Sequence, residues 1–156
     1  MIEDLKIELL AKCKQHTSVL AQLWLDEVGK DSDPRPRTEH VIQRFIEHCN
    51  EEKLPLAYAA IYQNNPIGMI CLRITEGILD NLTPWLGGLV VHPDYRRKKV
   101  GERLVSIVKE QARTLDYSEL YLLSDDALSS WYKKLGWQKI GIADNDPGIL
   151  IMAISL

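Results

Sequence analysis

Four consecutive cations followed closely by a glycine are the first feature of this sequence that points to chemistry. The run comprises Arg96, Arg97, Lys98 and Lys99, and Val100 and Gly101 follow it. Arginine binds phosphate through charge-assisted, bidentate hydrogen bonds, and a glycine lets a bulky anion approach the backbone closely. A run of like charges is also typical of a solvated loop. The run by itself therefore leaves phosphate binding and a plain surface loop equally open.

The residues around this run predict a strand before it and a helix after it. An apolar stretch ends at His92-Pro93, where proline cannot continue a central strand. From Val100 onward, apolar residues recur at helical spacing. A helix begins with backbone N–H groups that have no partner inside the helix, and its dipole is positive at that end. The basic run is therefore predicted to lie at a helix N-terminus, which suits a phosphate.

Tyr132 is a second residue with a chemical use. It opens the segment Tyr-Lys-Lys-Leu-Gly-Trp, which ends at Trp137. A tyrosine hydroxyl can return a proton to a departing anion. Leu128, Tyr132 and Leu135 also share one face of a predicted helix, so plain core packing explains the residue as well.

The two segments together resemble the GNAT superfamily of N-acyltransferases. The acyl-CoA signature of that family is Gln or Arg, two residues, Gly, one residue, then Gly or Ala. Arg96 and Gly101 match it, whereas Lys99 replaces the middle glycine. The second family segment, a helix ending in Tyr-x-x-x-Gly-aromatic, corresponds to residues 132–137. The resemblance covers most of the chain, although residues 1–55 contribute only a compatible pattern.

The resemblance implies an N-acetyltransferase that moves an acetyl group from acetyl-CoA to a primary amine by direct attack on the thioester, with coenzyme A as product. Tyr132 would be the general acid. The backbones of Leu89 and Val91 would pair with the pantetheine arm and the thioester. The pyrophosphate loop would consist of Arg96, Arg97, Lys98, Lys99, Val100 and Gly101. Asp125 falls near a family asparagine that contacts the pantetheine arm.

The general base is left open by the same comparison. Family members often carry a glutamate on the central strand or its neighbour, where this chain has Gly87, Gly88 and Leu122. The remaining candidates are Glu76, Asp80, His92, Asp125 and Asp126. Each of them is also explained as a cap or a turn former. The Gly87-Gly88 pair predicts a β-bulge, a close backbone approach or a tight packing spot.

Lys99 and the missing base keep a rival function open, a non-catalytic acyl-CoA sensor of the same fold. A lysine strains the turn if the family glycine needs positive φ, or its ammonium points outward and adds charge. A nucleic-acid-binding module that uses residues 96–99 is the other rival. It lacks an aromatic platform and a wider basic stripe.

Composition indicates one cytoplasmic domain that spans residues 1–156. A chain of 156 residues with 46% apolar residues can build a core, and a net charge of −3 argues against nonspecific nucleic-acid binding. The three cysteines show no metal-site spacing, so reduced thiols are the simplest explanation for them. The sequence shows neither a signal peptide nor a membrane-spanning run. We expect a monomer or homodimer whose partner is a small-molecule or peptide amine, with no metal, nucleic acid or membrane.

The chain order of patterns predicts an α/β fold, a central mixed sheet with helices on both faces. Strands are expected at 5–10, 56–62, 67–74, from about 82 to the basic run, and at 119–124, 138–142 and 149–154. Helices are expected at 19–28, from about 38 to 49, from 100 to 115 and at 127–135. Thr17 or Ser18 is expected to cap the first helix and Gly29 to end it. His40 and His48 are expected on the polar side of the second helix, solvated rather than bound to metal.

Overall fold

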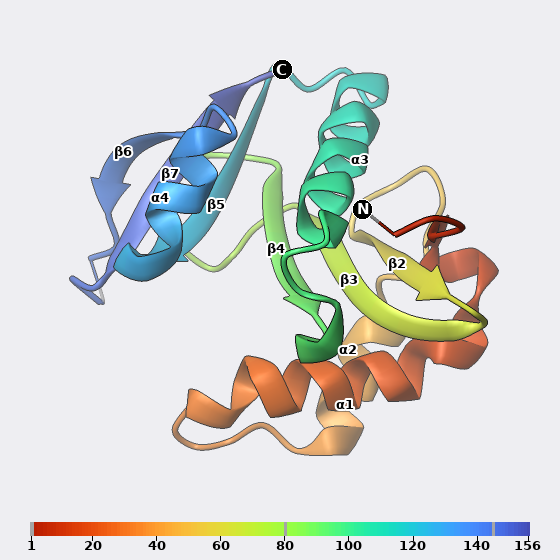
Figure 1. Ribbon diagram of the computed structural model, residues 1–156. Coiled ribbons are helices and arrows are strands. Elements are labelled where there is room, and N and C mark those ends of the chain that lie inside the picture. The colour runs from red at the N-terminus through yellow and green to blue at the C-terminus, as the bar shows by residue number, and fades with distance from the viewer. Residues whose placement is uncertain (1, 80, 145) are drawn as a thin grey trace.

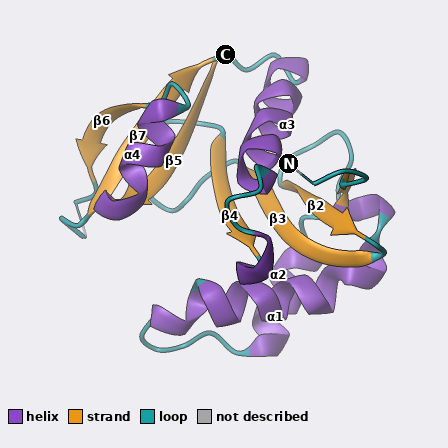
Figure 2. Cartoon of the chain, in the orientation of Figure 1, coloured by secondary structure: helices purple, strands orange, loops and turns teal. Residues whose placement is uncertain are grey.

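A seven-stranded mixed sheet organises the chain (Figures 1 and 2). The computed structural model describes residues 2–79, 81–144 and 146–156. The strand order is β1-β2-β3-β4-β5-β7-β6, and β4 pairs with β5 in parallel. The other neighbouring strands pair antiparallel. Asp80, one of the candidate bases, lies outside the described residues.

The element order agrees with the predicted one, and the predicted fold class is confirmed. The strands are β1 (Lys6–Leu9), β2 (Leu56–Tyr62), β3 (Asn65–Arg73), β4 (Trp85–Val91), β5 (Glu119–Asp125), β6 (Gln138–Ile142) and β7 (Ile149–Ser155). The helices are α1 (Thr17–Glu27), α2 (Thr38–Ile46), α3 (Val100–Thr114) and α4 (Asp126–Lys134). Single 3-10 turns lie at Leu10–Lys12, Lys14–His16, Gly29–Asp31 and Pro93–Tyr95. Within the described residues, no helix is long and apolar enough to cross a membrane.

Alternating side chains of the central strands bury both faces of the sheet. In β2, Ala57, Ala59 and Ile61 join the core under α1 and α2. Leu56, Tyr58 and Ala60 join the core with the buried residues of α3 and α4. This is the period of two that a strand imposes on its side chains. The predicted helices on both faces are therefore present (Figure 1).

The ends of α1 differ from the prediction. The helix begins at Thr17 itself, and His16 stands at the cap position without a side-chain bond. The Thr17 hydroxyl instead donates to the Lys14 carbonyl over 2.8 Å. Gly29 does not end α1 in a left-handed conformation. An ideal Cβ there would lie 2.6 Å from Cζ3 of Trp24, so close packing requires the glycine.

Helix α2 is shorter than predicted, and this changes the expected position of His48. The helix ends at Ile46, which is 48% exposed. The expected solvated position of His48 is wrong, because only 4% of its surface is exposed. The chain turns after Ile46, so helical spacing no longer decides which way His48 points.

Candidate functional site

Strands β4 and β5 pair over a short stretch and then diverge (Figure 1). The parallel ladder joins Trp85 to Tyr121 and Leu86 to Leu122. Leu89 and Val91, farther along β4, are half-buried. Where two strands separate, an extended ligand with amide groups can pair with the main chain as an added strand does. The main chain of β4 beyond Leu86 is therefore not paired with β5, and it can pair with an extended ligand that carries amide groups.

A β-bulge at Gly88-Leu89, directly after Gly87, bends β4 where it leaves β5, and the glycine pair predicts a bulge here. Cys71 pairs with Gly87 and Met69 with Val90, so two residues of β4 oppose one of β3. Gly88 has a φ of +60°, which glycine adopts without strain. Bulges of this kind redirect a strand and are frequent beside active sites.

The N-terminus of α3 follows a tightly wound turn formed by residues 96–99, which we call the basic turn. Arg97 and Lys99 both adopt left-handed conformations, with φ of 60° and 68°. The N–H of Arg103 donates to the Lys99 carbonyl over 3.2 Å, so the N–H groups before it precede the helical ladder. Lysine cannot accept a hydrogen bond, and no side chain among the described residues caps this end. Several donors are thereby left for an external anion.

The four cationic side chains of the basic turn have different surroundings. Arg96 donates from Nε to the Val91 carbonyl over 3.1 Å and from Nη2 to Glu27 Oε1 over 2.6 Å. These bonds tie the turn to β4 and α1. Arg97 and Lys99 are exposed, and neither forms an ion pair with any residue that the structure describes. Both left-handed residues therefore carry a charge that no described residue pairs.

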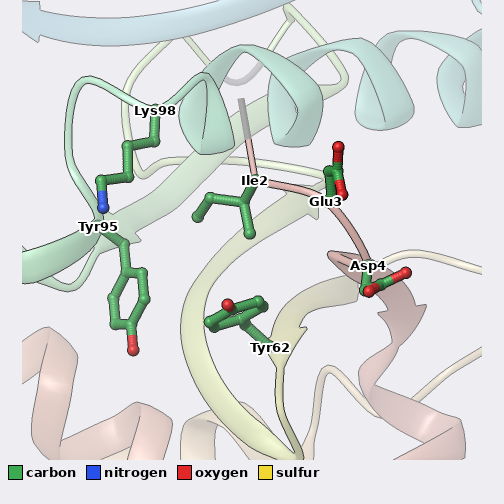
Figure 3. A pocket seen from close by; sticks show the side chains of 6 residues that line it. All are labelled: Ile2, Glu3, Asp4, Tyr62, Tyr95 and Lys98. Carbon is green, nitrogen blue, oxygen red and sulfur yellow. The ribbon is translucent and has the colours of Figure 1, made fainter.

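Lys98 faces a pocket on the other side of the turn (Figure 3). Its ammonium lies 5.9 Å from the ring centroid of Tyr95, and the rings of Tyr95 and Tyr62 meet edge to face at 5.7 Å. The pocket has a volume of about 460 Å³ and is also lined by Ile2, Glu3 and Asp4. Cation–π contacts at exposed sites contribute about 0.5–1 kcal/mol. Lys98 thus contacts Tyr95 within the same loop and lines this pocket together with the N-terminal segment.

Gly101 brings the two predicted motifs together. An ideal Cβ on Gly101 would lie 3.3 Å from Cζ2 of Trp131, so α4 packs directly on the first turn of α3. Trp131 Nε1 donates to Glu102 Oε1 over 2.9 Å, which fixes the indole there. Tyr132 follows Trp131, and their ring centroids are 4.8 Å apart. The tyrosine of the second motif therefore lies near the N-terminus of α3.

Tyr132 is buried, with 5% of its surface exposed. Leu128, expected to pack on the same face, is 51% exposed; the Tyr132 ring instead contacts Trp131 and Trp137. Among the described residues no group hydrogen-bonds its hydroxyl. Burial, and next the Asp125 carboxylate, raise the pKa of Tyr132 well above its ordinary value. The hydroxyl is therefore protonated and able to donate.

Asp125 and Gly136 bound α4 as predicted. Asp125 Oδ1 accepts from the Leu128 N–H over 2.8 Å at the N-cap, and Gly136 has a φ of +100° just past the end of the helix. The other expected role of Asp125, contact with a pantetheine arm, stays a prediction.

A buried group of polar side chains lies beside the bulge, and sequence reasoning did not find it as a group. It consists of His48, Arg73 and Glu76, here called the Arg73 cluster. Arg73 Nε donates to His48 Nε2 over 2.8 Å, and Arg73 Nη1 donates to Glu76 Oε1 over 2.8 Å. His48 Nδ1 lies 2.7 Å from the Arg44 carbonyl, to which it donates because Nε2 is the acceptor. Burial, then the Arg73 charge, lower the pKa of His48 to about 4, so the ring is neutral.

The Arg73 cluster occupies the space that side chains on Gly87 and Gly88 would fill. An ideal Cβ on Gly87 would lie 2.5 Å from Glu76 Oε1 and 2.7 Å from Arg73 Nη1. One on Gly88 would lie 2.8 Å from the Cys71 sulfur. The glycine pair was the available signal, since two missing side chains within an apolar strand indicate that another group fills their place.

A second pocket, of about 450 Å³, begins next to Glu76. Its apolar lining comes from the segment after β3 and from the β6–β7 hairpin, and Asp144 adds one carboxylate. The apolar side chains are Ile78, Leu79, Ile140, Ile142 and Ile151. Ile140 and Ile142 are 52% and 48% exposed.

Replacing Lys99 by glycine tests why a lysine occupies the left-handed position. We expect Lys99→Gly to leave thermal stability unchanged or raised, because a left-handed non-glycine residue costs about 1–2 kcal/mol. If Lys99 holds no phosphate, affinity for acetyl-CoA also stays similar; thermal melting and titration calorimetry at two salt concentrations measure both. Lys99→Ala, which keeps the strain and loses the charge, is the control. A large loss of affinity in Lys99→Gly would instead make Lys99 a phosphate ligand.

Comparisons with known proteins agree with the family that the sequence motifs resemble. Residues 18–137 match the model of the Acetyltransferase (GNAT) family. An amino-acid acetyltransferase from Edwardsiella ictaluri (strain 93-146) is 28% identical over 111 residues, 69% of this chain. This chain spans 21% of the length of that relative.

Solved structures share the fold over nearly the whole chain. An aminoglycoside 6'-acetyltransferase type Ii superposes with a TM-score of 0.71 at 26% identity, covering 96% of each chain. An aminoglycoside 6'-N-acetyltransferase complexed with coenzyme A gives a TM-score of 0.71 at 22% identity, again over 96% of each chain. An acetyltransferase from Streptococcus agalactiae 2603 gives 0.73 at 16% identity, covering 99% of this chain and 100% of that one.

Proposed function

This chain belongs to the GNAT family of acetyltransferases, and from that premise we propose that it transfers an acetyl group from acetyl-CoA to a primary amine. The observation that carries the proposal is the packing of Trp131 on Gly101, because it sets Tyr132 beside the uncapped end of α3. The uncapped end of α3 and a protonated hydroxyl then lie close together, and Val100 and Tyr132 share one core cluster with Leu86 of β4 and Leu122 of β5. The neighbour that was solved with coenzyme A supports this cofactor.

Some groups at the start of α3 contact the pyrophosphate of acetyl-CoA, and others hold the basic turn in place. Backbone N–H groups of Val100 and Gly101 donate to the pyrophosphate, since no helical carbonyl is available to them. Arg97 supplies charge to the same group, and the affinity of Lys99→Gly decides whether Lys99 does so as well. Arg96 holds the turn through Glu27 and Val91, and Lys98 holds it through Tyr95. The basic turn is thus both a ligand and a fixed support.

The main chain of β4 serves the other half of the cofactor. Leu89 and Val91 offer backbone groups to the amides of the pantetheine arm, and Asp125 stands at the end of β5 opposite them. Backbone N–H groups there stabilise the negative charge that forms on the thioester oxygen during attack. Tyr132 then donates its proton to the departing sulfur.

We propose that the acceptor enters through the pocket beside Glu76. Its apolar walls favour an amine that carries an apolar portion, and Asp144 attracts the cationic form of an amine. The similar proteins are named for amino-acid and aminoglycoside acceptors. An acceptor screen with acetyl-CoA should therefore include phenethylamine, leucine and kanamycin. Steady release of the free coenzyme A thiol identifies an accepted amine.

A non-catalytic acyl-CoA sensor is the second candidate function. The glycine pair on β4 favours it, because the strand itself offers no carboxylate to act as base. A sensor binds acetyl-CoA and releases no thiol with any amine. The acceptor screen therefore separates the two functions.

Acetyl-CoA is expected to stabilise the protein by mass action, by about 2.7 kcal/mol at 100 times its dissociation constant. S-acetylpantetheine, which lacks the pyrophosphate, should stabilise it much less. Arg97→Ala should weaken acetyl-CoA binding, because it removes a charge from the phosphate site. Thermal melting with each ligand measures this, and Arg113→Ala, near the opposite end of α3, is the matched control. If calorimetry detects no binding at millimolar acetyl-CoA, the proposed function is wrong.

A further inference from the structure

We infer that Glu76 is the general base of this enzyme, an assignment that rests on the proposed function. Glu76 comes from the segment after β3, yet its carboxylate lies where a β4 side chain would stand. Its Oε1 is 2.5 Å from the ideal Cβ position of Gly87. The glycine therefore does not remove a carboxylate from this point of β4. It makes room for one that arrives from the neighbouring segment.

The carboxylate is held in place by a relay of hydrogen bonds that begins on α2. The Arg44 carbonyl accepts from His48, His48 accepts from Arg73, and Arg73 donates to Glu76. Arg73 is 7% exposed, so its guanidinium is packed as well as bonded. A base must be fixed in one orientation to receive a proton efficiently. His48 and Arg73 are the residues that position it.

Glu76 also keeps access to the space in front of β4. Its side chain is 17% exposed, and Arg73 bonds to Oε1. Among the described residues, Oε2 has no hydrogen-bond partner. The acceptor pocket begins at the next residue, Gly77. The carboxylate therefore stands one residue from the pocket lining, with one oxygen that no described residue binds.

The other candidate bases that the structure describes take different positions. His92 Nδ1 accepts from the Asp94 N–H over 3.1 Å and caps the turn before the basic run. Asp125 caps α4, and Asp126 is an exposed residue in the first turn of that helix. Among these side chains, Glu76 alone packs against the β4 bulge.

The proposed step balances as follows. Glu76 removes one proton from the ammonium and, as the bond to carbon forms, a second from the attacking nitrogen, directly or through one water, and passes each to solvent. The amine nitrogen forms a bond to the thioester carbonyl carbon, and the bond from that carbon to sulfur breaks. Tyr132 gives its proton to the sulfur and regains one from solvent. The products are the N-acetylated amine and coenzyme A.

The test compares wild type with Glu76→Gln, using acetyl-CoA and the best amine from the screen. Gln keeps an acceptor for Arg73, so folding and acetyl-CoA affinity should be unchanged. At pH 7 we expect kcat/KM to fall about 100-fold, at the lower end of the range for general bases. The deficit should shrink as pH rises, because more of the amine is already unprotonated. A structural role would give a deficit that does not depend on pH.

Two further variants keep the test decisive. Glu76→Asp keeps the negative charge but moves it back, because the side chain is one methylene shorter. We expect its activity to lie between those of wild type and Glu76→Gln, even if Glu76→Gln folds poorly. Asp126→Asn is the matched control and should behave as wild type. Full activity in Glu76→Gln, or a deficit constant with pH, overturns the assignment and leaves the proposed function intact. If wild type binds acetyl-CoA but releases no thiol with any amine, the proposed function fails, and the assignment fails with it.

Discussion

Tyr132→Phe is expected to lower acetyl transfer by about 10²- to 10⁴-fold while acetyl-CoA still binds with wild-type affinity. The change removes only the hydroxyl, because the ring keeps its contacts with Trp131 and Trp137. No described residue loses a hydrogen bond. Folding should therefore change little, and the loss falls on the step in which the sulfur departs.

The burial of Tyr132 determines when its hydroxyl can release a proton. Burial raises its pKa, so the proton stays on the oxygen across the working pH range. It is released only when a strong anion forms nearby, as at the departing thiolate. Single-turnover acetyl transfer measures this step apart from product release.

Tyr58→Phe is the matched control, because it also removes a partly buried phenol hydroxyl. That hydroxyl donates to Gln111 on α3 over 3.2 Å, which is a structural contact. Tyr58→Phe should melt at a slightly lower temperature and turn over normally. Unchanged turnover in Tyr132→Phe would remove the catalytic role and leave the residue as packing, while the family assignment stands.

Local sequence signals account for much of the fold. Asp125 and Gly136 bound α4 because a short acidic side chain satisfies the first N–H groups of a helix and glycine accepts positive φ at its end. Gln63 and Asn64 turn between β2 and β3 with φ of 50° and 64°. Gly87 and Gly88 predicted the bulge. In each case the cause lies within a few residues, so the sequence reveals it.

The Arg73 cluster could not be predicted in the same way. His48 and Arg73 are 25 residues apart, and their contact depends on where α2 ends and how β3 is placed. The pairing of Arg96 with Glu27, 69 residues apart, is similar. Tertiary packing gives the Arg96 guanidinium two protein partners, and its expected contact with phosphate stays a prediction. Tertiary packing decides which side chains meet across different elements, and the spacing of residues in the sequence does not reveal it.

The buried, neutral His48 has a consequence for stability in acid. Its pKa lies near 4 in the folded protein and near 6.5 when unfolded. Between these values the unfolded chain binds more protons, so the free energy of unfolding decreases as pH falls from 6.5 to 4. A shift of this size corresponds to about 3 kcal/mol. Most of that stability is lost once the solution reaches pH 4.

His48→Gln tests this consequence, because Gln can accept the hydrogen bond from Arg73 but does not titrate. Denaturant unfolding at pH 7 and pH 4 should show wild type losing about 3 kcal/mol more than His48→Gln over that interval. Carboxylates that titrate in the same range affect both proteins alike and cancel in the difference. His40→Gln, at an exposed position of α2, should lose as much as wild type. If wild type and His48→Gln lose stability in parallel, His48 is not held neutral by its burial beside Arg73, and the relay that positions Glu76 begins at Arg73 instead.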